Sequence, residues 1–305
     1  MKGRIIAVVG PTGSGKTGLS VRIAEAVNGE IISMDSMQVY RGMDIGTAKA
    51  TVSERRGIPH HMIDIKDPRE SFSCAEFCDT AGKIADDMIS RGKVPVLCGG
   101  TGLYLDTLLK LEGFSPDVPP GIRAELAAET PKTLYAELLE ADPESAGKIH
   151  PNNVKRVIRA LEIYRGTGVP KSEWDRRSVR NESRYDARIV RLEYRDRRGL
   201  YQAIDRRVDA MMEKGLAGEC AGLDLDRSSQ AAQAIGYKEI YMWLDGLISR
   251  EEAVELLKKN TRNYAKRQLT WFRRYTDALV LYRDEADEKQ LLDAALRYCG
   301  KDLLS

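Results

Sequence analysis

Residues 10–17 carry the clearest chemistry in the sequence, because they form a glycine-rich loop suited to holding phosphate groups. The segment fits the pattern G-x-x-x-x-G-K-[ST] at every fixed position. Glycines let successive backbone N–H groups converge on phosphate oxygens, Lys16 adds a positive charge, and the Thr17 hydroxyl suits a Mg²⁺ ion bridging two phosphates. We therefore predict Mg²⁺ as the cofactor, Thr17 as its protein ligand, and a diphosphate-binding set of Gly10, Pro11, Thr12, Gly13, Ser14, Gly15, Lys16 and Thr17.

The loop alone leaves the phosphate compound open, since ATP, GTP and other diphosphate esters present the same two groups. The sequence contains no Asn-Lys-x-Asp segment, the element with which switch GTPases read guanine. It also lacks a long apolar strand ending in paired acids after its middle, which a mechanical ATPase needs. Small kinases and other group-transfer enzymes remain.

Two further segments with chemical potential each follow a short apolar run. Asp35 follows residues 30–34, and its carboxylate could accept a proton from a nucleophile, hold magnesium, or only cap the next helix. Gly99-Gly100-Thr101-Gly102 follows residues 94–98. Its glycines would let a ligand approach the backbone closely and Thr101 could donate to a phosphate oxygen, whereas the alternative is a tight turn.

The elements that must position these residues alternate between strand and helix. Strand-like runs occupy residues 5–9, 30–34, 94–98 and 187–194, and helical spacing occupies 16–27, 74–91 and 103–110. This rhythm predicts an α/β fold, a P-loop NTPase-like parallel sheet flanked by helices, in which the carboxyl ends of the strands share one edge.

An all-helical insertion is predicted within this α/β domain. Prolines at 116, 119 and 120 interrupt the pattern, and residues 122–164 are helical in composition. We place the insertion at 113–186 and the core domain at 1–112 and 187–305. The last part, from residue 197, is mostly helical, with one strand-like run at 278–282.

Composition excludes several other classes of protein. The 305 residues are 42% hydrophobic, but the longest apolar runs are strand-sized, so we expect no membrane span and, without a signal peptide, a cytoplasmic protein. Five scattered cysteines predict reduced thiols, with Cys74 and Cys78 as buried hydrophobic side chains. His60 and His61 are adjacent and cannot share one face, which favours local hydrogen bonding over metal binding.

Several ordered blocks resemble the bacterial tRNA dimethylallyltransferase family. The most discriminating is Asp-Ser-Met-Gln-Val-Tyr-Arg-Gly-Met-Asp-Ile-Gly-Thr-Ala-Lys at 35–49, because the phosphate loop at 10–17 is shared by many unrelated enzymes. The other blocks lie at 59–64, 99–104, 156–162, 233–239 and 261–273. The resemblance covers nearly the whole chain, and its departures are slight, with Gly13 and Ala50 in place of Ala and Pro.

The resemblance implies transfer of a dimethylallyl group from dimethylallyl diphosphate to N6 of adenosine 37, in tRNAs that read codons beginning with U. By the same match, Asp35 accepts the proton, Thr101 lies near the reacting centre and Arg123 lies near the RNA and the reaction channel, so these three are the implied catalytic residues. The implied tRNA-binding positions, for an anticodon loop with A36-A37-A38, are Asp35, Ser36, Met37, Gln38, Thr101, Arg123, Lys155, Arg156, Arg159, Tyr237 and Lys238. We expect a monomer without a membrane partner.

Each of two basic segments could either have a function or form ordinary protein surface. Residues 258–274 hold seven basic and no acidic residues and predict an amphipathic helix, whose basic face either binds tRNA phosphates or is merely solvated. Residues 176–207 hold eleven arginines with five interspersed acids, which predicts surface ion pairs. Without the family resemblance, a small-molecule or nucleotide kinase would be the first hypothesis, with this segment as a phosphate-clamping lid. A tRNA-binding module with a vestigial phosphate site is a third.

Overall fold

A computed structural model describes residues 2–110, 118–119, 121–178 and 182–300. The chain divides into two compact units. Residues 1–109 and 184–305 form one, here called the core unit, and residues 110–183 form the other, the helical unit. The chain leaves and re-enters the core unit at adjacent points, since Arg184 N donates to Leu109 O at 3.0 Å. Among the described helices, none combines the length and the apolar character needed to cross a bilayer.

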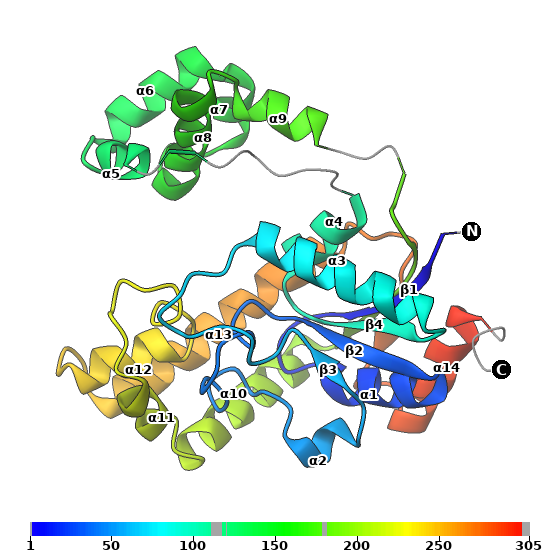
Figure 1. Ribbon diagram of the computed structural model, residues 1–305. Coiled ribbons are helices and arrows are strands. Elements are labelled where there is room, and N and C mark those ends of the chain that lie inside the picture. Colours follow the sequence, from blue (N-terminus) through cyan, green and yellow to red (C-terminus); the bar gives the residue numbers. More distant parts are fainter. Residues whose placement is uncertain (1, 111–117, 120, 179–181, 301–305) are drawn as a thin grey trace. The chain divides into compact units, whose positions relative to one another are not determined.

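The core unit is built on a parallel sheet with the strand order β3-β2-β4-β1-β5-β6 (Figure 1). The strands are β1 (Arg4–Val9), β2 (Gly29–Met34), β3 (His60–His61), β4 (Val94–Gly99), β5 (Asp186–Glu193) and β6 (Leu279–Tyr282). The predicted parallel sheet and all five predicted strands are confirmed. Sequence reasoning missed β3, because a two-residue strand shows no periodicity.

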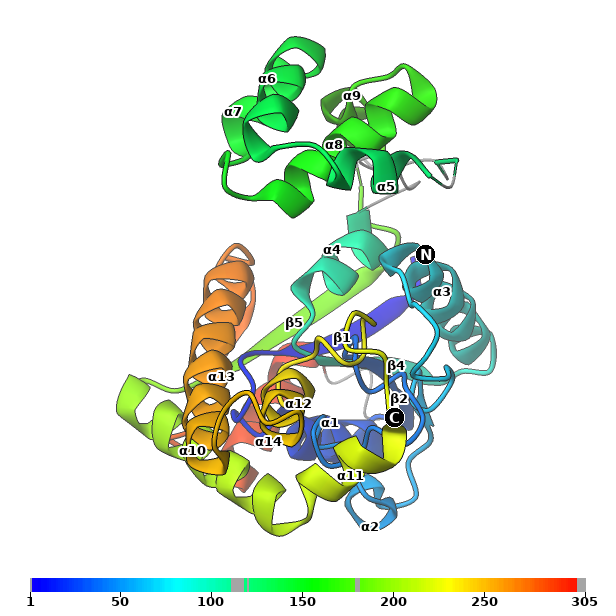
Figure 2. The same ribbon diagram turned by 90° about the vertical axis from the view of Figure 1, so that its left-hand side faces the viewer.

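Helices cover both faces of the sheet (Figures 1 and 2). On one face, α1 (Lys16–Ala26) and α14 (Glu288–Cys299) pack against Ile6 and Val8 of β1. On the other, alternate β1 residues such as Ile5 and Ala7 pack in a larger core. The remaining helices of the unit are α2 (Val52–Arg55), α3 (Cys74–Ser90), α4 (Gly102–Lys110), α10 (Arg197–Glu213), α11 (Leu216–Leu223), α12 (Tyr237–Leu244) and α13 (Arg250–Phe272). Burial on both faces explains why β1 is an unbroken apolar run.

The helical unit has a hydrophobic core of its own. Its helices are α5 (Ile122–Ala127), α6 (Pro131–Ala141), α7 (Pro143–Lys148), α8 (Val154–Thr167) and α9 (Lys171–Arg177). Leu126, Leu134, Leu138 and Leu161 are fully buried in that core. Proline stands at the first position of α6 and α7, where its missing N–H costs no intrahelical hydrogen bond.

Three neighbouring strands end at the same edge of the sheet. Gly99, the last residue of β4, is in register with Val9 of β1 on one side and Met34 of β2 on the other. The phosphate loop follows Val9, and Asp35 follows Met34. The fold therefore brings the three predicted chemical segments together.

Candidate active site

The phosphate loop is tightly packed and has a backbone conformation that depends on glycine. Gly13 and Gly15 have φ of 81° and 84°, in the left-handed region that favours glycine. A Cβ on Gly10 would lie 2.2 Å from the Leu192 carbonyl oxygen, so β5 packs directly against the loop. Lys16 Nζ donates to the Pro11 carbonyl at 2.7 Å. The Ser14 hydroxyl is buried without a hydrogen-bond partner in the described part of the chain, which leaves it available to a phosphate oxygen.

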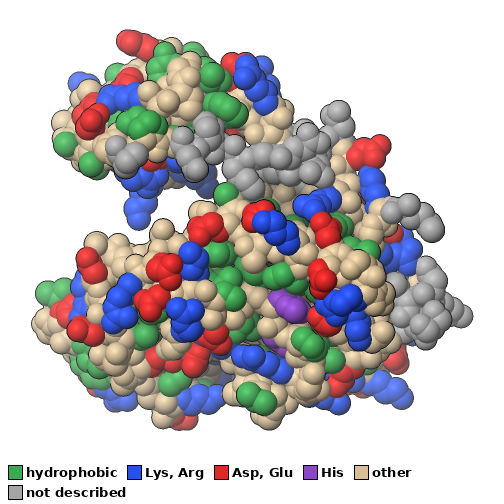
Figure 3. Space-filling view, viewed as in Figure 1, with side chains coloured by type: hydrophobic (Ala, Val, Ile, Leu, Met, Phe, Trp, Pro, Cys, Tyr) green, Lys and Arg blue, Asp and Glu red, His purple; other side chains and the backbone are tan. Residues whose placement is uncertain are grey.

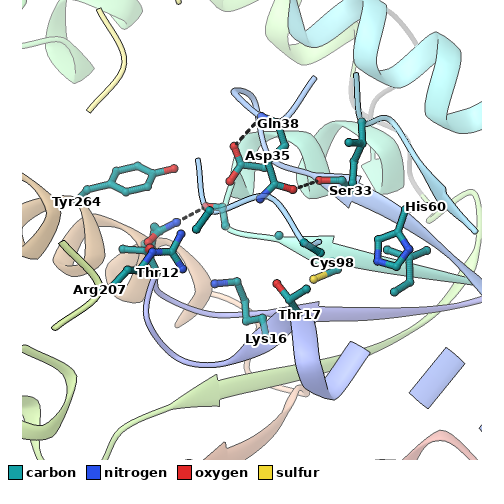
Figure 4. Close-up of a pocket in the computed structure, with 17 residues that line it drawn as sticks. Thr12, Lys16, Thr17, Ser33, Asp35, Gln38, His60, Cys98, Arg207 and Tyr264 are labelled. Atoms are coloured by element: carbon teal, nitrogen blue, oxygen red, sulfur yellow. Dashed lines mark hydrogen bonds between the residues drawn. The ribbon is translucent and has the colours of Figure 1, made fainter. Parts of the chain in front are cut away.

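Two cavities meet at this edge of the sheet, and Asp35 borders both. Figure 4 shows the residues that line the smaller one. The smaller, of about 90 Å³, is lined by Lys16 and Thr17 and reaches His60 of β3. The larger, of about 300 Å³, lies between the loop after β2 and α10 and α13. The residues common to both linings are Thr12, Asp35, Arg207 and Tyr264. A ligand in one cavity would therefore meet a ligand in the other beside a carboxylate.

The Asp35 side chain both caps a turn and faces the cavities. Its Oδ1 accepts from Met37 N at 2.9 Å and from Gln38 N at 3.4 Å. No described residue donates to its Oδ2. Asp35 could therefore cap the turn through Oδ1 and act on a ligand through Oδ2, so the two interpretations of this residue are compatible.

The residues after Asp35 divide between the two cavities. Ser36 and Met37 line the larger one, and Gln38 lines the smaller. The Gln38 amide is fixed at both ends, since its Oε1 accepts from Ser33 Oγ at 3.0 Å and its Nε2 donates to the Thr47 carbonyl at 3.3 Å. This segment is shaped by its own hydrogen bonds before any ligand binds.

The Gly-Gly-Thr-Gly turn is tight for a reason in addition to the one predicted. A Cβ on Gly100 would lie 2.0 Å from Gln268 Nε2, and one on Gly102 would lie 2.1 Å from Trp271 Cδ1. These glycines therefore admit α13, while Gly99 and Gly100 also line the smaller cavity, as expected of a turn that a ligand can approach. Thr101 accepts from Ser36 N at 3.3 Å through its hydroxyl and is absent from the described linings of both cavities.

Arg207 is the main site residue that sequence reasoning missed. It comes from α10, borders both cavities, and donates to the Thr47 carbonyl at 3.3 Å. Burial lowers its pKa, and the negative charge of Asp35 opposes that shift. Burial likewise lowers the pKa of Lys16 to about 8, with a further lowering from the charge of Arg207. Two cations are thus desolvated beside one acid, which is typical of a site that binds an anion.

The other arginines between 176 and 207 mostly behave as predicted. Arg184 pairs with Asp86, Arg191 with Glu193 and Arg195 with Glu285. The prediction of ion pairs is confirmed for these residues, although the Arg191 pair is buried. Arg207 differs from these arginines in lining the two cavities, and no pattern in the neighbouring sequence indicates this difference.

Tyr237 is a correction to the predicted tRNA-binding set. Its side chain is fully buried, and its hydroxyl donates to Glu219 Oε1 at 2.5 Å. Burial and the neighbouring Glu219 raise its pKa. The ring packs on Gly46, where a Cβ would lie 2.5 Å away, so Tyr237 supports the cavity loop from behind. Lys238, the next residue, is exposed.

Glu219 fixes the same loop through its backbone. Its carboxylate accepts from Asp44 N at 2.9 Å, Ile45 N at 2.7 Å and Gly46 N at 3.0 Å. Gly46 and Thr47 then line the larger cavity. The loop between β2 and α2 therefore depends on α11 for its shape.

The remaining predicted RNA-binding residues belong to the helical unit. Arg123 is exposed on α5 and pairs with Glu162 of α8 at 2.8 Å, and Arg159 pairs with the same carboxylate at 2.9 Å. Lys155 and Arg156 are exposed on α8. The unit thus presents several basic side chains of its own.

The basic segment of α13 is less unpaired than its sequence suggests. Lys258 pairs with Asp209 at 2.7 Å and Arg262 with Asp205 at 2.5 Å. Arg274, beyond the helix end, pairs with Asp106 at 2.5 Å. The partners come from α10 and α4, so these three residues form ion pairs that neither interpretation of the basic face included. Figure 3 shows basic and acidic side chains interspersed over one face of the core unit.

The histidines and cysteines have local roles. His60 Nδ1 lies 2.8 Å from the Ile58 carbonyl and His61 Nε2 lies 2.7 Å from Glu30 Oε2, which confirms the predicted hydrogen bonding. All five cysteines are free, with Cys78 buried and Cys74 half-buried. The described residues contain no group of three or more His, Cys, Asp or Glu side chains that could hold a metal ion.

Comparisons with known proteins match this chain over almost its full length. The IPP transferase family model matches residues 38–275, and the isopentenyl transferase model matches residues 3–68. The tRNA dimethylallyltransferase of Anoxybacillus flavithermus is 48% identical over 274 residues, covering 88% of this chain and 87% of the relative. That of Halalkalibacterium halodurans is 45% identical over 310 residues, covering 99% and 98%.

Solved structures are similar as well. The tRNA isopentenylpyrophosphate transferase of Bacillus halodurans matches with a TM-score of 0.73 and 44% identity, covering 99% of this chain and 97% of that one. A eukaryotic dimethylallyltransferase acting on tRNA matches with a TM-score of 0.81 and 33% identity, covering 92% and 74%.

Proposed function

The chain belongs to the IPP transferase family, and we propose that it moves a dimethylallyl group from dimethylallyl diphosphate to N6 of adenosine 37 in tRNA, releasing diphosphate. Prenyl transfer to tRNA follows from the family. The donor and the target atom are our proposal, and its main support is the pair of cavities that share Asp35. The family comparisons do not favour the kinase alternative. The proposed substrate, tRNA, points to the cytoplasm.

The phosphate loop and the smaller cavity suit the diphosphate of the donor. Lys16 and the start of α1 place positive charge at one end of the site, where Thr17 adds a hydroxyl. Mg²⁺ binds through few protein ligands together with phosphates and water, so the Thr17 hydroxyl with the substrate oxygens is a fitting donor set. When bound, Mg²⁺ would neutralise charge on the departing diphosphate.

The larger cavity suits an extruded purine. Ser36 and Met37 form one side, and apolar residues including Val208, Met211 and Leu257 line it elsewhere. Flipping a base out of an anticodon stack costs a few kcal/mol, which contacts in such a pocket must offset. We propose that the exposed residues Arg123, Lys155 and Arg156 and the half-buried Arg159 hold the RNA backbone, as does Lys238.

In the proposed reaction, N6 of the adenine attacks the allylic carbon. The new N–C bond forms as the C–O bond to diphosphate breaks, and the electron pair of that bond leaves with the diphosphate. Asp35 accepts the proton that N6 loses. Arg207 and Lys16 stabilise the negative charge that builds on the leaving group, where burial strengthens their effect.

Incubation of the protein with Mg²⁺, radiolabelled dimethylallyl diphosphate and an anticodon stem-loop carrying A36-A37-A38 tests this function. We expect label in the RNA, and none when guanosine replaces adenosine 37. Phosphate transfer from ATP without labelled RNA would instead support a kinase. RNA retention without either product would support the tRNA-binding module.

Diphosphate binding should depend on pH through Lys16. Because its pKa in the empty site is about 8, Lys16 is charged below that pH and becomes neutral above it. We expect the affinity for Mg²⁺-diphosphate to fall as pH rises through 8, by up to about tenfold per pH unit. Calorimetric titrations between pH 6.5 and pH 9.5 would measure this fall.

Lys16→Arg is the matched control, since guanidinium stays charged over the whole range. Its affinity should show no loss above pH 8 beyond that caused by the ionisation of diphosphate itself. The ratio of the two affinities therefore isolates Lys16. A ratio that does not change with pH would contradict the assignment.

A further inference from the structure

One buried amide joins two parts of the candidate site that are distant in sequence. Gln268 of α13 is only 4% exposed. Its Oε1 accepts from the backbone N–H of Thr12 in the phosphate loop at 2.8 Å. Its Nε2 donates to the carbonyl of Gly100 in the Gly-Gly-Thr-Gly turn at 3.0 Å. The amide oxygen therefore bonds to the segment that follows β1, and the amide nitrogen bonds to the segment that follows β4.

The amide packs closely against the Gly-Gly-Thr-Gly turn and also borders the smaller cavity. Nε2 occupies the place where Gly100 would carry a Cβ, which would lie only 2.0 Å away. Three residues further along the same helix face, Trp271 occupies the corresponding place at Gly102. One helical turn earlier, Tyr264 borders both cavities. A single face of α13 therefore packs on the turn and borders both cavities.

We propose that Gln268 is a positioning residue that holds the phosphate loop and the Gly-Gly-Thr-Gly turn at a fixed separation. The turn carries Thr101, whose hydroxyl accepts from Ser36 N next to Asp35. The side chain thus links the diphosphate site to the segment bearing the proton acceptor. That these sites serve one transfer reaction rests on the proposed function.

A fixed separation between the two segments would help to align the reacting atoms of the two substrates. Group transfer between two bound substrates is fast only when the reacting atoms are held close and aligned, and errors near 1 Å can cost about 10²-fold in rate. A glutamine at this place fits, because its amide offers a donor and an acceptor on one planar group without adding charge. Asparagine is shorter by one methylene, and glutamate lacks the donor.

Gln268→Met tests the proposal, since it keeps the length of the side chain and removes both hydrogen bonds. We expect Mg²⁺-diphosphate to bind about tenfold more weakly, the cost of roughly one lost hydrogen bond. We also expect kcat to fall and the KM for dimethylallyl diphosphate to rise, with the KM for the stem-loop nearly unchanged. The control is Thr270→Ala, whose exposed hydroxyl bonds only to its own helix, at the Lys266 carbonyl.

Diphosphate binding is measured without RNA. This measurement therefore tests the proposal even if prenyl transfer is never observed. Wild-type diphosphate affinity in Gln268→Met, with the melting temperature alone reduced, would overturn the proposal and leave a purely structural role. Failure of wild-type protein to label RNA would instead count against the proposed function.

A pair of substitutions gives a second test. Gly100→Ala places a methyl group against Nε2 and should weaken diphosphate binding by displacing the amide. In Gly100→Ala/Gln268→Ala the space is free, so the double variant should bind diphosphate no worse than Gln268→Ala alone. Contacting residues show such non-additivity, whereas additive losses would contradict the proposed contact.

Discussion

Asp35→Asn is expected to lower the rate of prenyl transfer by about 10²- to 10⁴-fold, the usual contribution of a proton acceptor. The amide oxygen of asparagine can still accept from Met37 N, so the turn that Asp35 caps should persist. Stem-loop binding and the melting temperature should stay close to wild type. Single-turnover labelling of the RNA would measure the rate of the chemical step directly.

Asp35→Ala separates the two functions of this side chain. It removes both the acceptor and the cap, so it should match Asp35→Asn in rate but also weaken stem-loop binding and lower the melting temperature. Wild-type turnover in Asp35→Asn would exclude Asp35 as the base. Equal melting temperatures for the two variants would show that the cap contributes nothing.

The second large effect is expected at Arg207. Arg207→Met keeps much of the apolar stem but removes the buried charge shared by the two cavities. Loss of a preorganised donor to developing charge typically costs about 10²- to 10³-fold in kcat. We expect a loss of this size in prenyl transfer, together with weaker binding of Mg²⁺-diphosphate.

Its neighbour provides the control. Arg206 is exposed on the same helix, so Arg206→Met removes the same charge without touching either cavity. We expect Arg206→Met to transfer the prenyl group at close to the wild-type rate. Equal losses in the two variants would point to general RNA attraction in place of a role at the diphosphate.

The sheet and the phosphate loop could be predicted because their causes are local. The apolar run of β1, the glycines that follow it and the helix from Lys16 are encoded within a few dozen residues. The rule that parallel strands share one carboxyl edge then places Asp35 beside the loop. Nothing further from the sequence is needed to bring those groups together.

Other features could not be predicted because the partner residues are remote in sequence. Arg207 looks like its ten neighbouring arginines until α10 places it at the cavities, 160 residues from the carbonyl of Thr47 that it binds. The basic segment of α13 shows no acids because they lie on α10 and α4. The glycines of the Gly-Gly-Thr-Gly turn indicated a close approach correctly, but only the fold shows that α13 packs there in addition to the smaller cavity.

Tyr237 shows how a motif can mislead. It lies in a block that resembles the family, and tyrosines often contact bases, yet its hydroxyl serves Glu219 in the interior. A recurring motif near an RNA site can therefore reflect the scaffold of the pocket as much as its surface.

The hydrogen bond from Arg184 N to Leu109 O closes the stem from which the helical unit emerges. Both ends of that unit therefore leave the core unit at one point. The chain then continues into β5, which pairs with β1 in the same sheet. An insertion that leaves and returns at adjacent points adds its length outside the sheet, so the pairing of β5 with β1 places no demand on how long the inserted segment is.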